Sequence, residues 1–175
     1  MKKLELIHII REEIKLLLEK NNKDLRQDDP MFLKRRERSK QTPGSNYVGM
    51  QKNKTLIFKT NSHTEPGTVY TQKIRLKDLP KLVKEHKGKK PRLEIVKLAT
   101  QGDIAVHCDC PAFKYWGFEY KAKKEDYGIH KQDKSPDVRN PGLKGSMCKH
   151  LDNVALVLPF NVVNITNDLR QQGIF

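Results

Sequence analysis

The amino-acid sequence predicts an α+β protein in which a small antiparallel-sheet domain follows an N-terminal helix and an extended basic arm. Three observations lead to this prediction. Apolar residues recur at three- and four-residue steps near the N-terminus, the next stretch holds almost no core-forming pattern, and short strand-like segments then alternate with helical ones. The predicted units are the helix (1–22), the arm (23–53) and the α+β domain (54–175).

An amphipathic helix is predicted for residues 3–20. Charged residues occupy one face, and the apolar stripe consists of Leu6, Ile7, Ile10, Ile14, Leu17 and Leu18. Such a stripe packs either on the protein's own domain or on another chain. Both interpretations stay open at the level of the sequence.

The arm carries a basic cluster made of Lys34, Arg35, Arg36, Arg38 and Lys40. A turn-rich stretch follows it, and segments of this kind are usually solvated linkers. The whole chain has a formal net charge of +14. A surface of this charge favours nucleic acid or the acidic face of a partner protein; a basic protein without such a partner is the alternative.

From residue 54 onward the pattern predicts short strands and helices. Turn residues separate four strand-like segments, at 55–58, 68–71, 93–98 and 104–107. Helices are predicted at 79–86 and 147–158. Pro159 is expected to end the second of these, and Asn164 to cap a last short helix.

The three cysteines indicate a metal rather than a disulfide. Cys108 and Cys110 follow a predicted strand with one residue between them, and Cys148 and His150 open a predicted helix with the same spacing. Three thiolates and one imidazole are a standard closed set of zinc ligands. We therefore expect one structural Zn²⁺ per chain, which staples the C-terminal strand, loop and helix together. Iron is the alternative metal, and three unrelated cysteines beside a core histidine are the alternative to any metal.

The insert between the two ligand pairs (113–145) mixes aromatic and basic residues. Its aromatics suit base stacking, but packing beside the metal is favoured because so long a loop needs internal contacts. Besides the arm's basic cluster, the candidate contacts with nucleic acid or a partner are Lys121, Lys123 and Lys124. His107 should alternate away from the first cysteine on its strand, and His130 is expected at the surface.

The pattern Cys-x-Cys, a long gap, and Cys-x-His opening a helix resembles the SWIM zinc finger. Residues 108–113 and 148–151 resemble its two signatures. The resemblance implies the same ligands: Cys108, Cys110, Cys148 and His150. Residues 139–141 and 145–151, together with the opening of the chain, resemble zinc-finger-like structural proteins of tailed bacteriophages.

Catalysis is not expected, because a closed site leaves no position for water or substrate. The Pro-Cys-x-x-Cys motif of zinc deaminases does not occur in the sequence either. The resemblance implies a non-enzymatic, zinc-stabilised structural protein of a phage particle, held to other virion proteins by its N-terminal helix and arm. A SWIM-like nucleic-acid-binding module is the alternative.

The expected location is the virion, after assembly in the host cytoplasm, or the cytoplasm itself. Charged residues interrupt the segment after Met1, and no apolar run is long enough for a bilayer, so we expect neither a signal peptide nor a membrane span. A membrane and a small-molecule substrate are therefore not expected as partners, whereas contact with DNA stays open.

Overall fold

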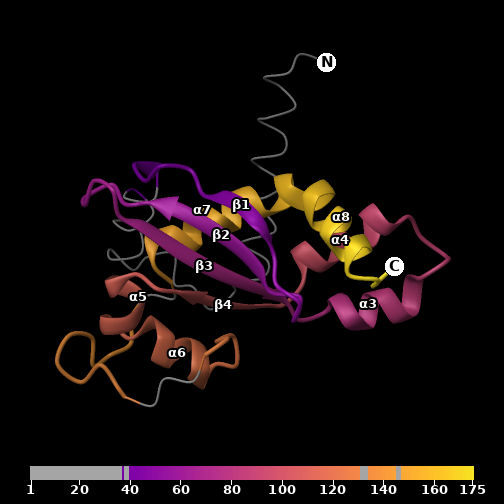
Figure 1. Ribbon diagram of the computed structural model, residues 1–175. Coiled ribbons are helices and arrows are strands. Elements are labelled where there is room, and N and C mark those ends of the chain that lie inside the picture. The colour runs from indigo at the N-terminus through magenta and orange to yellow at the C-terminus, as the bar shows by residue number, and fades with distance from the viewer. Residues whose placement is uncertain (1–36, 38–39, 131–133, 145–146) are drawn as a thin grey trace.

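Figure 1 shows the computed structural model, which describes residues 37, 40–130, 134–144 and 147–175. The helix predicted over 3–20 lies outside the described residues. So do four members of the arm's basic cluster: Lys34, Arg35, Arg36 and Arg38. The fifth member, Lys40, is exposed and places its Nζ 2.9 Å from Oε1 of Glu37.

A four-stranded antiparallel sheet, with its strands in chain order, forms the centre of the fold. Its strands are β1 (Asn46–Met50), β2 (Leu56–Asn61), β3 (Val69–Leu76) and β4 (Ile104–Cys108). Along β2, Leu56, Phe58 and Thr60 are buried and the residues between them are not, which is the alternation of a half-buried strand. The sheet and its helices confirm the predicted α+β class.

Strand β1 lies inside the range assigned to the extended arm, so that prediction is wrong for these residues. The Tyr47 ring of β1 packs 5.2 Å from the Phe58 ring, centroid to centroid. Its hydroxyl donates to Oδ2 of Asp168 at 2.5 Å. Because both partners are distant in sequence, no local hydrophobic pattern marks this strand.

The strand predicted over 93–98 is also wrong, because these residues belong to a helix, α4 (Arg92–Gln101). Its buried residues are Ile95, Val96 and Ala99, which share one helical face. Leu93, which would continue the alternation of a strand, is 47% exposed. A short apolar run of this kind fits both the two-residue repeat of a strand and the 3.6-residue repeat of a helix. Packing against the rest of the core decides in favour of the helix.

The other helical elements of the described residues are α3 (Leu79–His86), α5 (Pro111–Tyr115), α6 (Phe118–Lys124), α7 (Lys149–Val157), η1 (Leu158–Asn161) and α8 (Val162–Gln171). The helix predicted at 79–86 is confirmed, and the one predicted at 147–158 forms α7. Pro159 lies within η1, where the chain leaves the α-helix. The predicted cap is wrong, because Asn164 lies inside α8 and Asn161 occupies the N-cap position.

The helices α7 and α8 cover one face of the sheet, and α5 and α6 lie beside β4 (Figure 1). The core between sheet and helices includes Phe58 and Ile74 from the strands and Val154 and Ile165 from the helices. The segment after α6 covers the outer edge of β4, since the Val106 N–H donates to the Tyr127 carbonyl at 2.7 Å. Both β4 and α7 are therefore fixed in the core.

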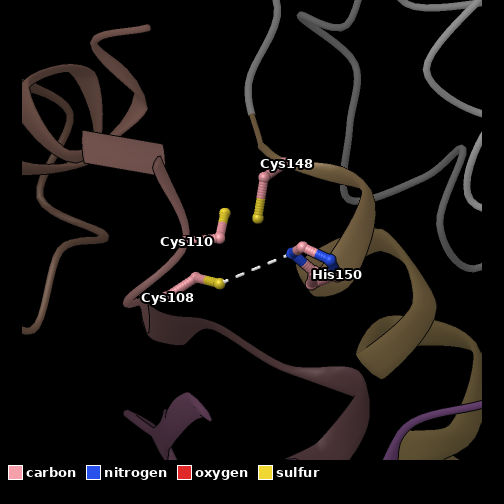
Figure 2. A group of neighbouring side chains, drawn as sticks. All are labelled: Cys108, Cys110, Cys148 and His150. Atoms are coloured by element: carbon pink, nitrogen blue, oxygen red, sulfur yellow. Dashed lines mark hydrogen bonds between the residues drawn. The ribbon is translucent and has the colours of Figure 1, made fainter. Parts of the chain in front are cut away.

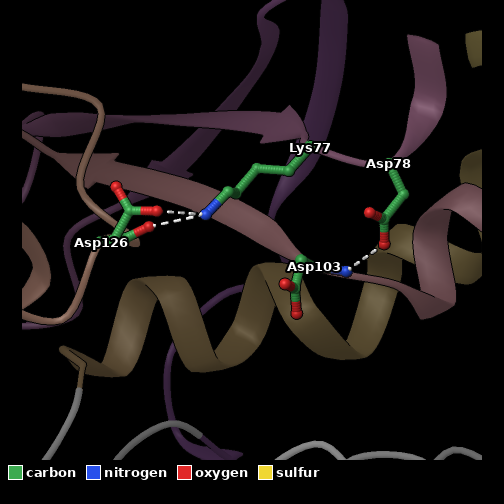
Figure 3. Close-up of polar contacts among 4 residues, drawn as sticks. All are labelled: Lys77, Asp78, Asp103 and Asp126. Carbon is green, nitrogen blue, oxygen red and sulfur yellow. Dashed lines mark hydrogen bonds and ion pairs between the residues drawn. The ribbon is translucent and has the colours of Figure 1, made fainter. Parts of the chain in front are cut away.

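A polar corner holds the chain at the start of β4 (Figure 3). Lys77 places its Nζ 2.7 Å from Oδ2 of Asp126 and donates its backbone N–H to the Asp103 carbonyl at 2.8 Å. The Asp103 N–H in turn donates to Oδ2 of Asp78 at 2.9 Å. The hydrogen bond and charge of Lys77 lower the pKa of Asp126. This corner joins the end of β3, the start of β4 and the end of α6.

Candidate metal centre

Four side chains from two distant segments meet in the core: Cys108, Cys110, Cys148 and His150 (Figure 2). Each of them is at most 2% exposed. Their ligand atoms all lie within 4.8 Å of one another. The two ligand pairs predicted from the sequence therefore form one buried cluster that is suited to hold a metal ion.

The first pair is positioned by the end of β4. Cys108 is the last residue of this strand, and Cys110 is the N-cap of α5. Between them, Asp109 accepts the Thr71 N–H through Oδ1 at 2.8 Å and donates its own N–H to the Thr71 carbonyl at 3.2 Å. These two hydrogen bonds fasten to β3 the turn that directs both thiols toward one point.

The second pair opens α7. Cys148 is the N-cap residue in an extended conformation, and His150 lies in the first turn of the helix. The N-terminus of a helix carries a partial positive charge, which favours a thiolate at this position. The strand, loop and helix predicted around the ligands are therefore present.

The distances within the cluster fit a tetrahedral ion. With Zn–S bonds of about 2.3 Å, neighbouring sulfurs of a tetrahedral zinc lie about 3.8 Å apart. Cys108 Sγ lies 4.0 Å from Nδ1 of His150, which faces the sulfurs (Figure 2). The other ring nitrogen, Nε2, is buried and has no hydrogen-bond partner among the residues that the structure describes. A metal bound in this arrangement would be ligated by Nδ1 of His150, with the ring proton on Nε2.

Burial and mutual hydrogen bonds shift the pKa values of the three thiols. Hydrogen bonds from Cys108 and Cys148 lower the pKa of Cys110, so its thiolate forms first. The hydrogen bond with Cys110 raises the pKa of Cys108, and burial raises the pKa of Cys148. Three thiolates in a buried site repel one another, and a divalent cation offsets this repulsion. The donor set therefore fits a thiophilic metal.

A buried chain of hydrogen bonds, which the sequence analysis missed, runs from the cluster across the sheet. Gln72 lies opposite Cys108 on the neighbouring strand, and its Nε2 is 3.7 Å from Sγ. Its Oε1 accepts the Thr60 hydroxyl at 2.8 Å. The Thr60 and Ser45 hydroxyls are 2.6 Å apart, and the Ser45 N–H donates to Oδ1 of Asn153, in α7, at 2.8 Å. The chain ends on the helix that carries two of the ligands.

The alternation of the strands contained the signal for this chain. Gln72 shares the buried face of β3 with Ile74 and Leu76, and Thr60 shares that of β2 with Phe58. A polar side chain at an inward position requires a hydrogen-bond partner. Two such residues on neighbouring strands therefore indicate a buried polar contact.

Asn140 organises the loop that leads to Cys148. It is 5% exposed. Its Nδ2 donates to the carbonyls of Trp116 at 3.1 Å and Lys144 at 3.0 Å, and its Oδ1 accepts the Lys144 N–H at 2.9 Å. Asn140 belongs to the motif 139–141 on which the resemblance to phage proteins partly rests. Its role in the described structure is to hold the insert together.

The two other histidines singled out in the sequence lie outside the metal cluster. His107 is half-buried, with Nδ1 3.2 Å from Oε1 of Glu119 and its ring edge-on to that of His130, at 4.2 Å between centroids. Burial lowers the pKa of His107 to about 4. His130 is exposed, as predicted.

The aromatic residues of the insert divide between the core and the surface. Phe113 and Phe118 are buried in the main core, which confirms the packing interpretation for them, whereas Tyr115 is 62% exposed. The candidate contacts Lys121, Lys123 and Lys124 lie on α6. Lys121 places its Nζ 3.8 Å from Oε1 of Glu125. Contact of these lysines with a partner stays a prediction.

No family model, curated protein or solved structure matches this chain. The resemblance to SWIM fingers and to phage proteins rests on the ligand spacing and the motifs quoted above. Among the described helices, none is long and apolar enough to cross a membrane.

Proposed function

We propose that the chain is a zinc-stabilised, non-enzymatic structural protein of a tailed-phage particle. The observation that carries the structural role is the closed cluster of four donors, each at most 2% exposed. Four protein ligands complete the tetrahedron of a zinc ion and leave no position for water or substrate. The task of the metal is then to hold β4 to α7.

The metal connects parts of the chain that are far apart in sequence, since Cys108 and His150 are 42 positions apart. A structural zinc contributes on the order of 10 kcal/mol to folding. The whole stability of a domain is about 5–15 kcal/mol. Without metal, the region from β4 to α7 should therefore lose its packing.

Apolar side chains left at the surface support a role in assembly. Leu156, Phe160 and Val163 are 38%, 58% and 57% exposed, and they lie in α7, η1 and α8. They follow one another at steps of four and three residues, and exposed apolar side chains close to one another are typical of surfaces that pack against other proteins. The amphipathic stripe predicted over 3–20 and the phage-like motif at 145–151 favour neighbouring virion proteins as the partners.

The metal is tested first, by elemental analysis of the purified chain with and without a chelator. We expect about one zinc per chain, and we expect its removal to abolish the near-ultraviolet circular dichroism of the folded core. If iron is found instead of zinc, the metal in the proposal becomes iron and its structural role is unchanged. No metal in protein kept fully reduced would remove the zinc-finger interpretation.

Assembly is tested with an N-terminal deletion that leaves β1 intact. A chain lacking residues 1–36 keeps Ser45 and the whole sheet. This variant should bind zinc as the full chain does and be missing from purified particles. A Phe160→Ser variant, which changes one exposed side chain, serves as the second probe. Normal incorporation of both variants would contradict the assembly role, whereas zinc content reports separately on the metal.

A further inference from the structure

The turn between α3 and α4 carries a dense positive charge that the sequence analysis did not single out. Residues 81–97 contain seven lysines or arginines and two acidic residues, whereas the longer insert, 113–145, contains eight lysines or arginines and five acidic residues. The basic side chains exposed on this segment are Lys81, Lys84, Lys87, Lys89, Arg92 and Lys97. Figure 1 shows α3 at the end of the molecule opposite α5 and α6.

The turn borders a hollow of about 490 Å³. It is lined by residues 87–92, by Ile95 and by Phe175. Four of these residues are lysine or arginine, and no aspartate or glutamate is among the lining residues that the structure describes. The hollow is therefore a basic concavity with an aromatic ring in its wall.

Backbone hydrogen bonds hold these cations on a folded turn. Gly88 adopts a φ of 79°, which a glycine reaches without strain, and lets the chain reverse. The N–H groups of Lys89 and Lys90 both donate to the His86 carbonyl, at 2.9 and 3.0 Å. Cationic side chains on an ordered turn lose less conformational freedom on binding than cationic side chains on an unstructured segment of any protein.

The turn is also tied to the C-terminal segment. Lys87 donates through Nζ to the Ile174 carbonyl at 3.4 Å. The guanidinium carbon of Arg92 lies 6.0 Å from the centroid of the Phe175 ring. Lys90 pairs with Glu94 at 3.0 Å, so one of the lining cations is partly neutralised. The ring and the remaining cations share one small surface.

We propose that this turn binds single-stranded nucleic acid, with its cations on the phosphates and a base stacked on Phe175. A basic groove next to an aromatic ring is the combination that proteins use for single strands. An acidic peptide would satisfy the lysines but offers no flat group for the ring. A concavity of this volume suits one nucleotide. The surface is separate from the metal centre, and the inference does not rest on the proposed assembly role.

The test measures the binding of zinc-loaded full-length protein to a fluorescein-labelled oligothymidylate, by anisotropy over a range of NaCl concentrations. The probe variant is Lys87→Gln/Lys89→Gln/Lys90→Gln. The matched control is Lys59→Gln/Lys114→Gln/Lys144→Gln, three exposed lysines outside the turn, because it lowers the formal net charge of +14 by the same three units. Zinc content and melting temperature show that both variants are folded.

Each phosphate contact contributes about −0.7 to the slope of log K against log salt for a single strand. Loss of three contacts should therefore reduce the slope of the probe variant by about 2, which corresponds to roughly 100-fold weaker binding at 0.1 M salt if binding is equal at 1 M. The control variant should keep the slope of the wild type. Equal losses in both variants would show that overall charge drives binding and would overturn the proposal.

Two further measurements test the aromatic ring and the identity of the partner. Phe175→Leu keeps an apolar side chain and should weaken oligothymidylate binding roughly 5- to 100-fold with an unchanged salt slope. Unchanged affinity of this variant would overturn the stacking of a base on the ring. Binding of the wild type to polyglutamate as tightly as to oligothymidylate would overturn nucleic acid as the partner.

Discussion

Replacing Gln72 by leucine should separate the role of this residue at the metal from its role in the core. Leucine has a similar volume, so the substitution leaves no sizeable cavity. It removes the contact with Cys108 Sγ at 3.7 Å, the bond to the Tyr70 carbonyl at 3.0 Å and the bond from the Thr60 hydroxyl at 2.8 Å. Thr60 keeps Ser45 as a partner at 2.6 Å, so its hydroxyl is not left unsatisfied.

The three lost contacts differ in strength, which sets the expected loss of unfolding free energy. A neutral hydrogen bond contributes about 1 kcal/mol, and a bond to a charged group contributes about 1.5–3 kcal/mol. The zinc form, in which Cys108 is a thiolate, should thus lose about 3–5 kcal/mol, and the metal-free form about 2 kcal/mol. Loss of an outer partner of a metal ligand also weakens zinc binding, by about 10- to 100-fold.

Urea unfolding with and without zinc measures the first difference, and competition with a chromogenic chelator measures the second. Gln171→Leu, at an exposed position on α8, is the control and should change neither quantity. If Gln72→Leu costs the same free energy with and without zinc and leaves zinc affinity unchanged, Gln72 acts only as a core residue and the reasoning fails.

Three further predictions concern the metal, the sheet edge and the insert. Cys148→Ser should lose zinc and unfold much of the segment from β4 to α7, seen as the loss of amide protection there; a melting temperature equal to that of the wild type would count against the metal site. Burial and the bond to Asp168 raise the pKa of Tyr47 above 10.0, so the phenol stays protonated in the folded state and its contribution is complete below pH 10. Above that pH the unfolded chain ionises and stability should fall by up to about 1.4 kcal/mol per pH unit, less so in Tyr47→Phe; identical alkaline slopes in urea unfolding would refute this. Gly117→Ala should destabilise the fold by more than about 1 kcal/mol in thermal unfolding, because φ is 86° and a Cβ would lie 2.1 Å from Cγ of Pro136. A neutral effect would mean that the loop around Pro136 moves aside.

The sequence predicted the cluster of three cysteines and one histidine because closely spaced pairs of possible metal ligands are a dense local signal. Two pairs with one intervening residue identified Cys108 and His150 as partners although they are 42 positions apart. The spacing of the apolar residues predicted α3 and α7 for the same reason, since a helix repeats its pattern locally. These parts of the fold depend on neighbours in the chain.

The predictions that were wrong concern residues whose structure depends on contacts distant in the sequence. Tyr47 belongs to a strand that is held by its contacts with Phe58 and Asp168. Residues 93–98, predicted as a strand, form part of α4 because one face of that helix is buried in the core. The roles of Gln72 and Asn140 follow from tertiary hydrogen bonds that no spacing encodes. The lysines of the turn after α3 can be read from the sequence, but the hollow beside them appears only in the folded structure.

The hydrogen-bond chain from Cys108 to Asn153 passes through Ser45, one residue before β1 begins. Residues before Ser45 lead into the segment for which we propose contacts with other proteins. The Cys/His cluster therefore lies at one end of this chain of hydrogen bonds, and Ser45 lies close to the other end. Because Asn153 holds the Ser45 N–H from α7, release of the metal should loosen both supports of Ser45 at once. The ion would then do more than hold β4 to α7: it would also fix the position of Ser45, through which residues 1–44 connect to the sheet.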